Sequence, residues 1–287
     1  MNAVISIRGL SHVYSPKTPF ECSAINDINL DIYAGETLGV IGHTGSGKST
    51  LISHLNGLIK PSSGTILYNG EDIFKSKEFT HSIRFKVGLV LQYPEYQLFE
   101  ETVYDDISFG PRNMGLSKEE IDIRVHEAAR FAGISEDYLP LSPFELSGGQ
   151  KRRVAIAGVI AMRPRVLILD EPTAGLDPIG REDLLAHISS YREETNAAIV
   201  IVSHSMEDIA SIADRLVVMN GGQIMLSGTP SEVFSHSDEL ISVGLDLPQV
   251  THIINKLRAR GLSLPDSVYT VEQAVSAILA LRGEQND

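Results

Sequence analysis

The sequence is poor in cysteine, in long apolar runs and in basic residues. Cys22 is the only cysteine among 287 residues, so a disulfide framework is excluded. The longest apolar stretches, at 154–162 and 197–202, are far shorter than the roughly 20 residues that a membrane-spanning helix needs. The chain is therefore not expected to cross a membrane itself.

Acidic residues outnumber basic ones. The 24 Lys and Arg residues stand against 37 Asp and Glu residues, which leaves a formal charge of −13. This charge opposes non-specific binding to nucleic acid or to an anionic lipid surface. We therefore expect no nucleic-acid partner, and any association with a membrane requires a protein partner. The first residues lack the basic and apolar pattern of an export signal, so the cytoplasm is the expected compartment.

Short apolar segments and helical patterns divide the chain. From about residue 100 to 161 the apolar residues recur at three- and four-residue intervals, which predicts a helical insert. Apolar strands return at 166–169, 199–202 and 216–219, with a helical stretch at 181–194, so a βαβ arrangement and a parallel sheet are expected. Further strands are predicted at 3–7, 28–32, 37–41 and 64–67, and the buried face of the insert at Ile121, Val125, Ala128, Ala129 and Ala132.

A second boundary is predicted near Gly228. Thr229 and the following Pro-Ser-Glu have the pattern of a helix cap. Two more helices are expected beyond it, one after Pro248 and one capped by Thr270. Residues 1–228 and 229–287 are therefore interpreted as a main domain and a small helical domain, although an amphipathic tail packed on the main domain is an equal alternative. The expected apolar faces are Val250, Ile253, Ile254 and Leu257 in one helix, and Val275, Ile278 and Leu281 in the other.

A phosphate-binding loop is the strongest signal in the sequence. Residues 42–49 read Gly42-His43-Thr44-Gly45-Ser46-Gly47-Lys48-Ser49, which matches G-x-x-x-x-G-K-[ST] between an apolar strand and a helical run. The backbone N–H groups from Gly45 to Thr50 can surround phosphate oxygens, and Lys48 adds a cation. Ser49 is the expected Mg²⁺ ligand, and a simple Gly-rich turn is the alternative.

Two carboxylates follow another apolar strand. Asp170 and Glu171 end the segment at 166–171, which has the Walker B pattern. Asp170 is the expected partner of Mg²⁺ or its water, and Glu171 the group that aligns a water on the γ-phosphate. Solvated surface charge is the alternative, but a phosphate-binding loop requires a metal ligand on a neighbouring strand.

A second Gly-rich loop precedes another helical stretch. Ser147, Gly148, Gly149 and Gln150 follow Leu146 and lead into residues 151–162. One nucleotide cannot use both loops of a chain if the helical insert holds them apart. The second loop is therefore expected to serve the nucleotide of another subunit.

With these motifs the sequence resembles the ATP-binding cassette superfamily over about residues 4–227. The resemblance implies an α/β fold with a RecA-like phosphate-loop core, an antiparallel β subdomain, a helical insert, and ATP with Mg²⁺ as cofactors. It assigns Tyr14 to adenine stacking, and Gln92 to Mg²⁺ and the attacking water. It assigns Asp177 to the loop that crosses the dimer interface, and His204 to a γ-phosphate contact. Taken singly, each could be an ordinary surface, turn or core residue.

A narrower resemblance is carried by residues 92–103 (QYPEYQLFEETV), 144–150 (FELSGGQ) and 243–248 (VGLDLP). They are similar to the ATPases of energy-coupling factor transporters, and residues 92–103 together with 174–178 (AGLDP) favour the second of the two ATPase types. The resemblance implies a peripheral subunit on the cytoplasmic face of the membrane that energises uptake of a vitamin or metal ion. It also implies a second ATPase subunit, as heterodimer or homodimer, and a separate substrate-binding membrane protein.

A transmembrane coupling subunit is the remaining implied partner, and its helices are expected in a groove near residues 93–103. Two other functions remain open. One is a soluble cassette ATPase acting in a nucleic-acid process, which the charge of −13 and the single cassette disfavour. The other is a non-transport assembly ATPase or nucleotide sensor, and Glu171 argues against a sensor without turnover.

Overall fold

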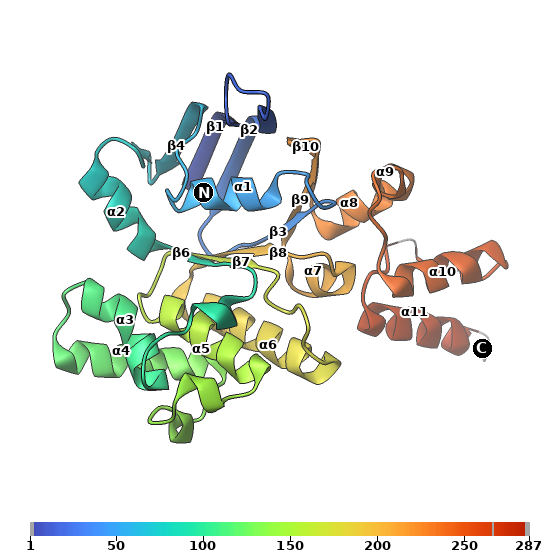
Figure 1. The fold of residues 1–287 in the computed structure, drawn as a ribbon. Helices are drawn as coiled ribbons and strands as arrows, with labels where there is room; N and C mark the ends of the chain where they lie inside the picture. Colours follow the sequence, from blue (N-terminus) through green and yellow to red (C-terminus); the bar gives the residue numbers. More distant parts are fainter. Residues whose placement is uncertain (1–2, 266, 285–287) are drawn as a thin grey trace.

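The computed structural model describes residues 3–265 and 267–284 and contains two β-sheets surrounded by helices (Figure 1). Within these ranges no helix is both long and apolar enough to cross a bilayer. The strands are β1 (Ala3–Tyr14), β2 (Cys22–Tyr33), β3 (Thr37–Ile41), β4 (Ser63–Tyr68), β5 (Glu71–Asp72), β6 (Val87–Val90), β7 (Val166–Asp170), β8 (Ala198–Val202), β9 (Arg215–Asn220) and β10 (Gln223–Gly228). The helices are α1 (Lys48–Leu55), α2 (Lys77–Lys86), α3 (Val103–Asn113), α4 (Lys118–Ala132), α5 (Gly148–Ile160), α6 (Pro178–Thr195), α7 (Met206–Ile212), α8 (Pro230–Ser235), α9 (Ser237–Ser242), α10 (Gln249–Ala259) and α11 (Val271–Glu284), with single 3₁₀ turns η1 (Pro94–Gln97), η2 (Glu136–Tyr138) and η3 (Pro143–Glu145).

The larger sheet has six strands in the order β10-β9-β3-β8-β7-β6. The five strands from β9 to β6 are parallel, and β10 pairs antiparallel with β9 at one edge. The predicted parallel sheet is thus confirmed. Because parallel strands end at the same edge of a sheet, the loops after β3, β6, β7 and β8 meet there. These four loops carry the phosphate loop, Gln92, Glu171 and His204, whereas the second Gly-rich loop precedes α5.

The smaller sheet is antiparallel, in the order β2-β1-β4-β5. It corresponds to the expected antiparallel β subdomain. Strands β1 and β2 are longer than the apolar segments predicted, because polar residues continue the pairing as far as Tyr14 opposite Cys22. This extension brings Tyr14 to the end of β1 that lies beside α1.

The six-stranded sheet separates two hydrophobic cores. Alternate residues of β7 point to opposite faces, so that Val166 and Ile168 join one core and Leu167 and Leu169 the other. The first core includes α1 and the antiparallel sheet, and the second includes the helical insert α3 to α5. All five residues predicted on the inner face of α4 are buried: Ile121, Val125, Ala128, Ala129 and Ala132.

The C-terminal helices pack in two ways. Helix α8 begins with the predicted capping box, in which the side chains of Thr229 and Glu232 each accept from the other residue's backbone. Phe234 of α8 and Leu240 of α9 belong to the second core of the main domain. Helices α10 and α11 share a separate small cluster of Ile254, Leu264, Val268 and Ala274. Figure 1 shows this helix pair projecting beyond α7.

The predicted apolar faces of the last two helices were partly wrong. Ile253 of α10 is 55% exposed, whereas the adjacent Ile254 is buried. On α11, Val275 is 50% and Ile278 is 43% exposed, and the small Ala274 is buried instead. The face of α11 that joins the cluster holds Ala274, Ala277 and the predicted Leu281, at positions i, i+3 and i+7, so it is rotated away from Val275 and Ile278.

Candidate functional site

The predicted phosphate loop joins β3 to α1 at the edge where the parallel strands end. Strand β3 is buried along its whole length, and α1 begins at Lys48 immediately after Gly47. Gly47 has a φ of +105°, and a Cβ there would meet the carbonyl oxygen of Ala24 at 2.6 Å. Only glycine meets both conditions without strain. The backbone N–H groups of the loop and the N-terminus of α1 therefore face the same position, where an anion can bind.

Lys48 is held inside this loop. Its side chain is buried, and Nζ donates to the carbonyl oxygens of Gly42 at 2.5 Å and His43 at 3.0 Å. Burial lowers the pKa of Lys48, and the nearby Glu171 and Asp170 carboxylates oppose that effect. The cation therefore has two carboxylates near it but is bonded only to carbonyl groups of its own loop.

Ser49 and Asp170 meet across two strand ends. The Ser49 hydroxyl donates to Asp170 Oδ2 at 3.5 Å, although the two residues are 121 positions apart in sequence. Burial raises the pKa of Asp170, and Lys48 and the Ser49 hydrogen bond oppose this. A hydroxyl and a carboxylate oxygen converge here, and hard oxygen ligands of this kind suit Mg²⁺.

Glu171 occupies a strained turn directly after β7. Its φ is +52°, an uncommon value for a residue other than glycine, and its N–H donates to the Val202 carbonyl at 2.9 Å. Its carboxylate faces His204, with Oε2 accepting from the backbone N–H at 3.4 Å and Oε1 lying 3.3 Å from Nε2. Burial raises the pKa of Glu171 to about 7, while burial and then Lys48 lower the pKa of His204.

A cavity of about 390 Å³ connects these groups. On one side lie Tyr14, 41% exposed, and Thr50, whose hydroxyl is 3.3 Å from the Tyr14 hydroxyl. Gln92, two residues beyond the end of β6, lies on another side. The predicted residues that line the cavity are Tyr14, Thr44, Gly45, Gly47, Lys48, Ser49, Thr50, Gln92, Asp170, Glu171 and His204.

Three further residues of the cavity were missed by sequence reasoning: Cys22, Ser23 and Ala24. They enter the site because β2 pairs with β1 beside Tyr14. No local pattern marks them, since their position depends on pairing between two strands. Gly42, His43 and Ser46 belong to the loop but do not line the cavity.

The second Gly-rich loop lies away from this cavity. Ser147 is the N-cap of α5 and forms a capping box with Gln150, and none of residues 147–150 lines the cavity. Asp177 also lies outside it, as the N-cap of α6, where its side chain accepts from the Gly180 N–H at 2.7 Å. The chain by itself therefore brings together only part of the predicted site.

A buried ion pair connects three of the motif segments. Arg152 of α5 is 4% exposed and forms a bidentate pair with Glu95 of η1, at 2.9 and 3.2 Å. The same guanidinium donates to the carbonyl groups of Pro172 and Ala174, just after Glu171. The sequence motifs assigned neither residue a role: Glu95 lies within the stretch 92–103 but was not singled out, and Arg152 lies two residues beyond the end of 144–150.

The residues of the cavity fit ATP and Mg²⁺. The buried Lys48 ammonium bonds only carbonyl groups, so it can turn to phosphate oxygens without losing an ionic partner. Ser49 and Asp170 already stand at contact distance as two oxygen ligands. A Cβ at Gly45 would meet nothing within 4 Å, so the space beside this residue is open to a ligand. Tyr14 offers a partly exposed ring at the far side of the cavity.

Comparison with known proteins agrees with this geometry. Residues 25–174 match the ABC transporter family. The chain is 56% identical, over 98% of its length and 99% of the relative's, to the energy-coupling factor transporter ATP-binding protein EcfA2 of Clostridium perfringens. It is 55% identical to the EcfA2 protein of Clostridium tetani, over 96% of each.

Solved structures give the same result. A structure of cbiO1 from Clostridium perfringens, described as part of the ABC transporter complex cbiONQ, matches with a TM-score of 0.76 and 39% identity. It covers 89% of this chain and all of that one. The dimeric bacterial ABC transporter cassette MJ0796 matches with a TM-score of 0.71 and 26% identity, over 79% of this chain and 98% of that one.

The chain belongs to the ABC transporter family of ATP-binding cassette proteins. It is an ATP hydrolase whose cofactors are ATP and Mg²⁺. Within the family it resembles the second ATPase type of energy-coupling factor transporters, as its sequence indicated.

Proposed function

We propose that this chain is the ATP-hydrolysing subunit that energises uptake of a vitamin or metal ion by an energy-coupling factor transporter. The proposal is supported by the identity of 56% over nearly the full length of an energy-coupling factor ATPase. The observation that carries the enzymatic part is the cavity in which Lys48, Ser49, Asp170, Glu171 and His204 converge.

The residues of the cavity have separate roles in phosphoryl transfer. Lys48 and the loop N–H groups bind the β- and γ-phosphates, while Ser49, Asp170 and Gln92 hold Mg²⁺, which neutralises phosphate charge when bound. Tyr14 stacks on adenine. These assignments rest on the residues' positions around one cavity.

Glu171 orients the attacking water and takes its proton, and His204 completes the γ-phosphate contacts. The pKa of about 7 suits a general base that works near neutral pH. The hydrogen bond from the His204 N–H to Glu171 Oε2, and the 3.3 Å contact between Oε1 and His204 Nε2, place both residues at the same end of the cavity.

The site is completed by a second ATPase subunit. Ser147, Gly148, Gly149 and Gln150 lie outside this chain's cavity, and they serve the γ-phosphate bound to the partner. Asp177 lies at the same interface. Binding of ATP therefore closes the dimer, because neither subunit contains a whole site. The partner is a related ATPase in a heterodimer or a second copy of this chain.

The coupling subunit docks beside η1. Exposed aromatic side chains gather on and around this turn, where Tyr93 and Tyr96 are 49% and 84% exposed and Phe99 is 59% exposed. Phe99 lies against Phe109 of α3 with ring centroids 5.0 Å apart. Exposed apolar groups of this size mark an interaction surface. The surface adjoins Gln92 on one side and the helical insert on the other, which suits coupling between transport and hydrolysis.

The chain is peripheral on the cytoplasmic face of the membrane. The solute is bound by a separate membrane subunit, and the coupling subunit links that protein to the ATPase pair. The acidic charge of −13 is consistent with attachment through proteins instead of through lipid.

The test combines hydrolysis with transport. Glu171→Gln should keep Mg-ATP binding but slow hydrolysis by roughly 10²–10⁴, the range for loss of a positioned base. In vesicles that contain the membrane subunits purified from the same cells, this variant should abolish solute uptake. Glu182→Gln, which removes an exposed carboxylate of α6, is the matched control. Normal turnover of Glu171→Gln would contradict the catalytic assignment, and uptake without ATP hydrolysis would contradict the transport function.

A further inference from the structure

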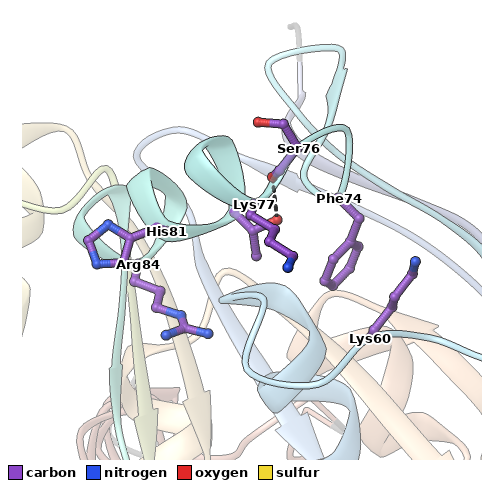
Figure 2. A pocket seen from close by; sticks show the side chains of 7 residues that line it. Lys60, Phe74, Ser76, Lys77, His81 and Arg84 are labelled. Carbon is purple, nitrogen blue, oxygen red and sulfur yellow. Dashed lines mark hydrogen bonds between the residues drawn. The ribbon is translucent and has the colours of Figure 1, made fainter.

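A basic pocket lies beside α2, apart from the nucleotide cavity. It is about 440 Å³ in volume and lies between the chain after α1 and helix α2. Lys60, Lys77, His81 and Arg84 line it, together with Phe74, Ser76 and Thr80 (Figure 2). In a chain with a formal charge of −13, this concentration of cations is unusual.

Helix α2 sets the spacing of the cations. Lys77, His81 and Arg84 stand at positions i, i+4 and i+7, so they share one face of the helix. The first turn is anchored by Thr80, whose hydroxyl donates to the carbonyl groups of Ile73 at 2.7 Å and Ser76 at 2.9 Å. Figure 2 shows the side chains of Lys60 and Lys77 on either side of the Phe74 ring.

In the part of the chain that the structure describes, the Lys and Arg residues of the pocket have no acidic partner. Throughout residues 3–265 and 267–284, no carboxylate lies within 4 Å of the side-chain nitrogens of Lys60, Lys77 or Arg84. Lys75, just outside the pocket, differs because it pairs with Glu71 and lies 3.9 Å from the centre of the Phe79 ring. Glu78 follows Lys77 in α2 but is not among the lining residues.

The floor of the pocket is apolar. The half-buried Phe74 packs against the first core and lies at the base, between the two lysines. A ligand here would thus meet an apolar floor, with the exposed side chains of Lys60, Lys77 and Arg84 at its rim. That combination suits an anion that carries a small apolar group, because the cations bind the charge and the ring binds the apolar part.

The pocket is independent of the nucleotide cavity, with which it shares no lining residue. Helix α1 starts at Lys48 in that cavity and runs away from it, and Lys60 lies beyond its end. Likewise Arg84 precedes β6, while Gln92 follows that strand. The strand and the helix therefore separate the two sites.

We propose that this pocket is a second anion site, which binds the phosphate group of a small phosphate ester through Lys60, Lys77 and Arg84. The apolar part of the ester rests on Phe74. A phospholipid headgroup offers the same phosphate chemistry as a soluble ester, so the test distinguishes these two sources.

The test uses the full chain saturated with Mg-ADP, so that the nucleotide cavity is filled. Calorimetric titration with phenyl phosphate should show one further site, with inorganic phosphate binding more weakly and phenol not measurably. Lys77→Gln/Arg84→Gln should weaken phenyl phosphate binding by at least about tenfold, since hydrogen bonds to charged groups are among the strongest. Lys256→Gln/Arg258→Gln removes the same charge from exposed positions of α10 and should change nothing.

A second experiment tests whether the phosphate group belongs to a lipid. Vesicles of phosphatidylcholine with and without phosphatidylglycerol are sedimented with the same three proteins. Each cation contributes roughly fivefold to binding at an anionic membrane, so the loss of two should weaken binding to the anionic vesicles about 30-fold. Such a loss in the α2 variant alone would support a headgroup ligand. Phenyl phosphate binding without vesicle binding would support a soluble ester. Absence of both, or equal losses in the two variants, would overturn the proposal.

Discussion

The buried carboxyl group of Glu171 should make the nucleotide-free protein less stable as the pH rises. Its pKa is about 7 in the folded chain, raised by burial from the ordinary 4.5. The folded state therefore binds this proton more tightly than the unfolded state does. The stability that this provides is complete below pH 4.5 and is lost as the pH rises through 7. Ionised Glu171 then lowers the free energy of unfolding by about 3 kcal/mol.

Replacement of Glu171 by Gln removes this titration while it keeps a similar shape. With these two pKa values, the ionisation of Glu171 costs the wild-type protein about 2 kcal/mol at pH 6 and about 3 kcal/mol at pH 8.5. Glu171→Gln should therefore be more stable than wild type, by a margin that grows by about 1 kcal/mol between these pH values.

Urea unfolding with EDTA and without nucleotide measures this margin. Unfolding curves of both proteins at pH 6, 7 and 8.5 give the free energies, and equal denaturant slopes show that the two proteins expose the same surface. Glu182→Gln, on the exposed surface of α6, controls for the loss of one negative charge from a chain at −13. A margin between Glu171→Gln and wild type that stays constant with pH would refute the burial argument.

Further changes test other parts of the site. Lys48→Ala should weaken ATP binding at least tenfold by calorimetry, because hydrogen bonds to charged groups contribute about 1.5–3 kcal/mol; unchanged affinity would count against the phosphate loop. Ser147→Arg should spare ATP binding at its own Lys48 but block single-turnover hydrolysis at the partner's site, and the reverse result would place this loop in cis. Arg152→Gln should lower the free energy of unfolding by about 1.5–3 kcal/mol, since the partly buried Glu95 loses its charged hydrogen bonds, and Glu95→Gln in the same chain should restore part of it; a neutral single variant would contradict this. The chain without residues 229–287 should still bind ATP, with a lower melting temperature by circular dichroism because Phe234 and Leu240 leave the core; failure to fold would show that the tail belongs to the main domain.

Much of the fold could be predicted because its signals are local. A buried parallel strand needs a run of apolar residues. The apolar runs at 37–41 and 166–169 therefore predict buried strands, and the structure has β3 and β7 there. The capping box at Thr229 involves residues three positions apart and is formed as predicted. The phosphate loop depends on three glycines within six residues and on Lys48, and the structure places it between β3 and α1 as expected.

Helix faces were less predictable. The apolar stripe of α11 was visible in the sequence, but whether Ala274 or Val275 is buried depends on which face of α11 packs against α10. A stripe of apolar residues is wider than the line of closest contact between two helices. Sequence periodicity thus determines that a helix has an apolar side, and packing decides which residues of that side are covered.

The motif residues were identified by sequence, whereas their environment came from tertiary structure. Spacing within a few residues was enough to select Lys48, Asp170 and Glu171, because each motif is built on one strand and the loop after it. The raised pKa of Glu171, the pair of Glu95 with Arg152, and the basic pocket around Phe74 all join segments far apart in the chain. Burial and charge partners of this kind arise only when strands pair and helices pack, because electrostatic and desolvation effects depend on distance in space instead of distance along the chain.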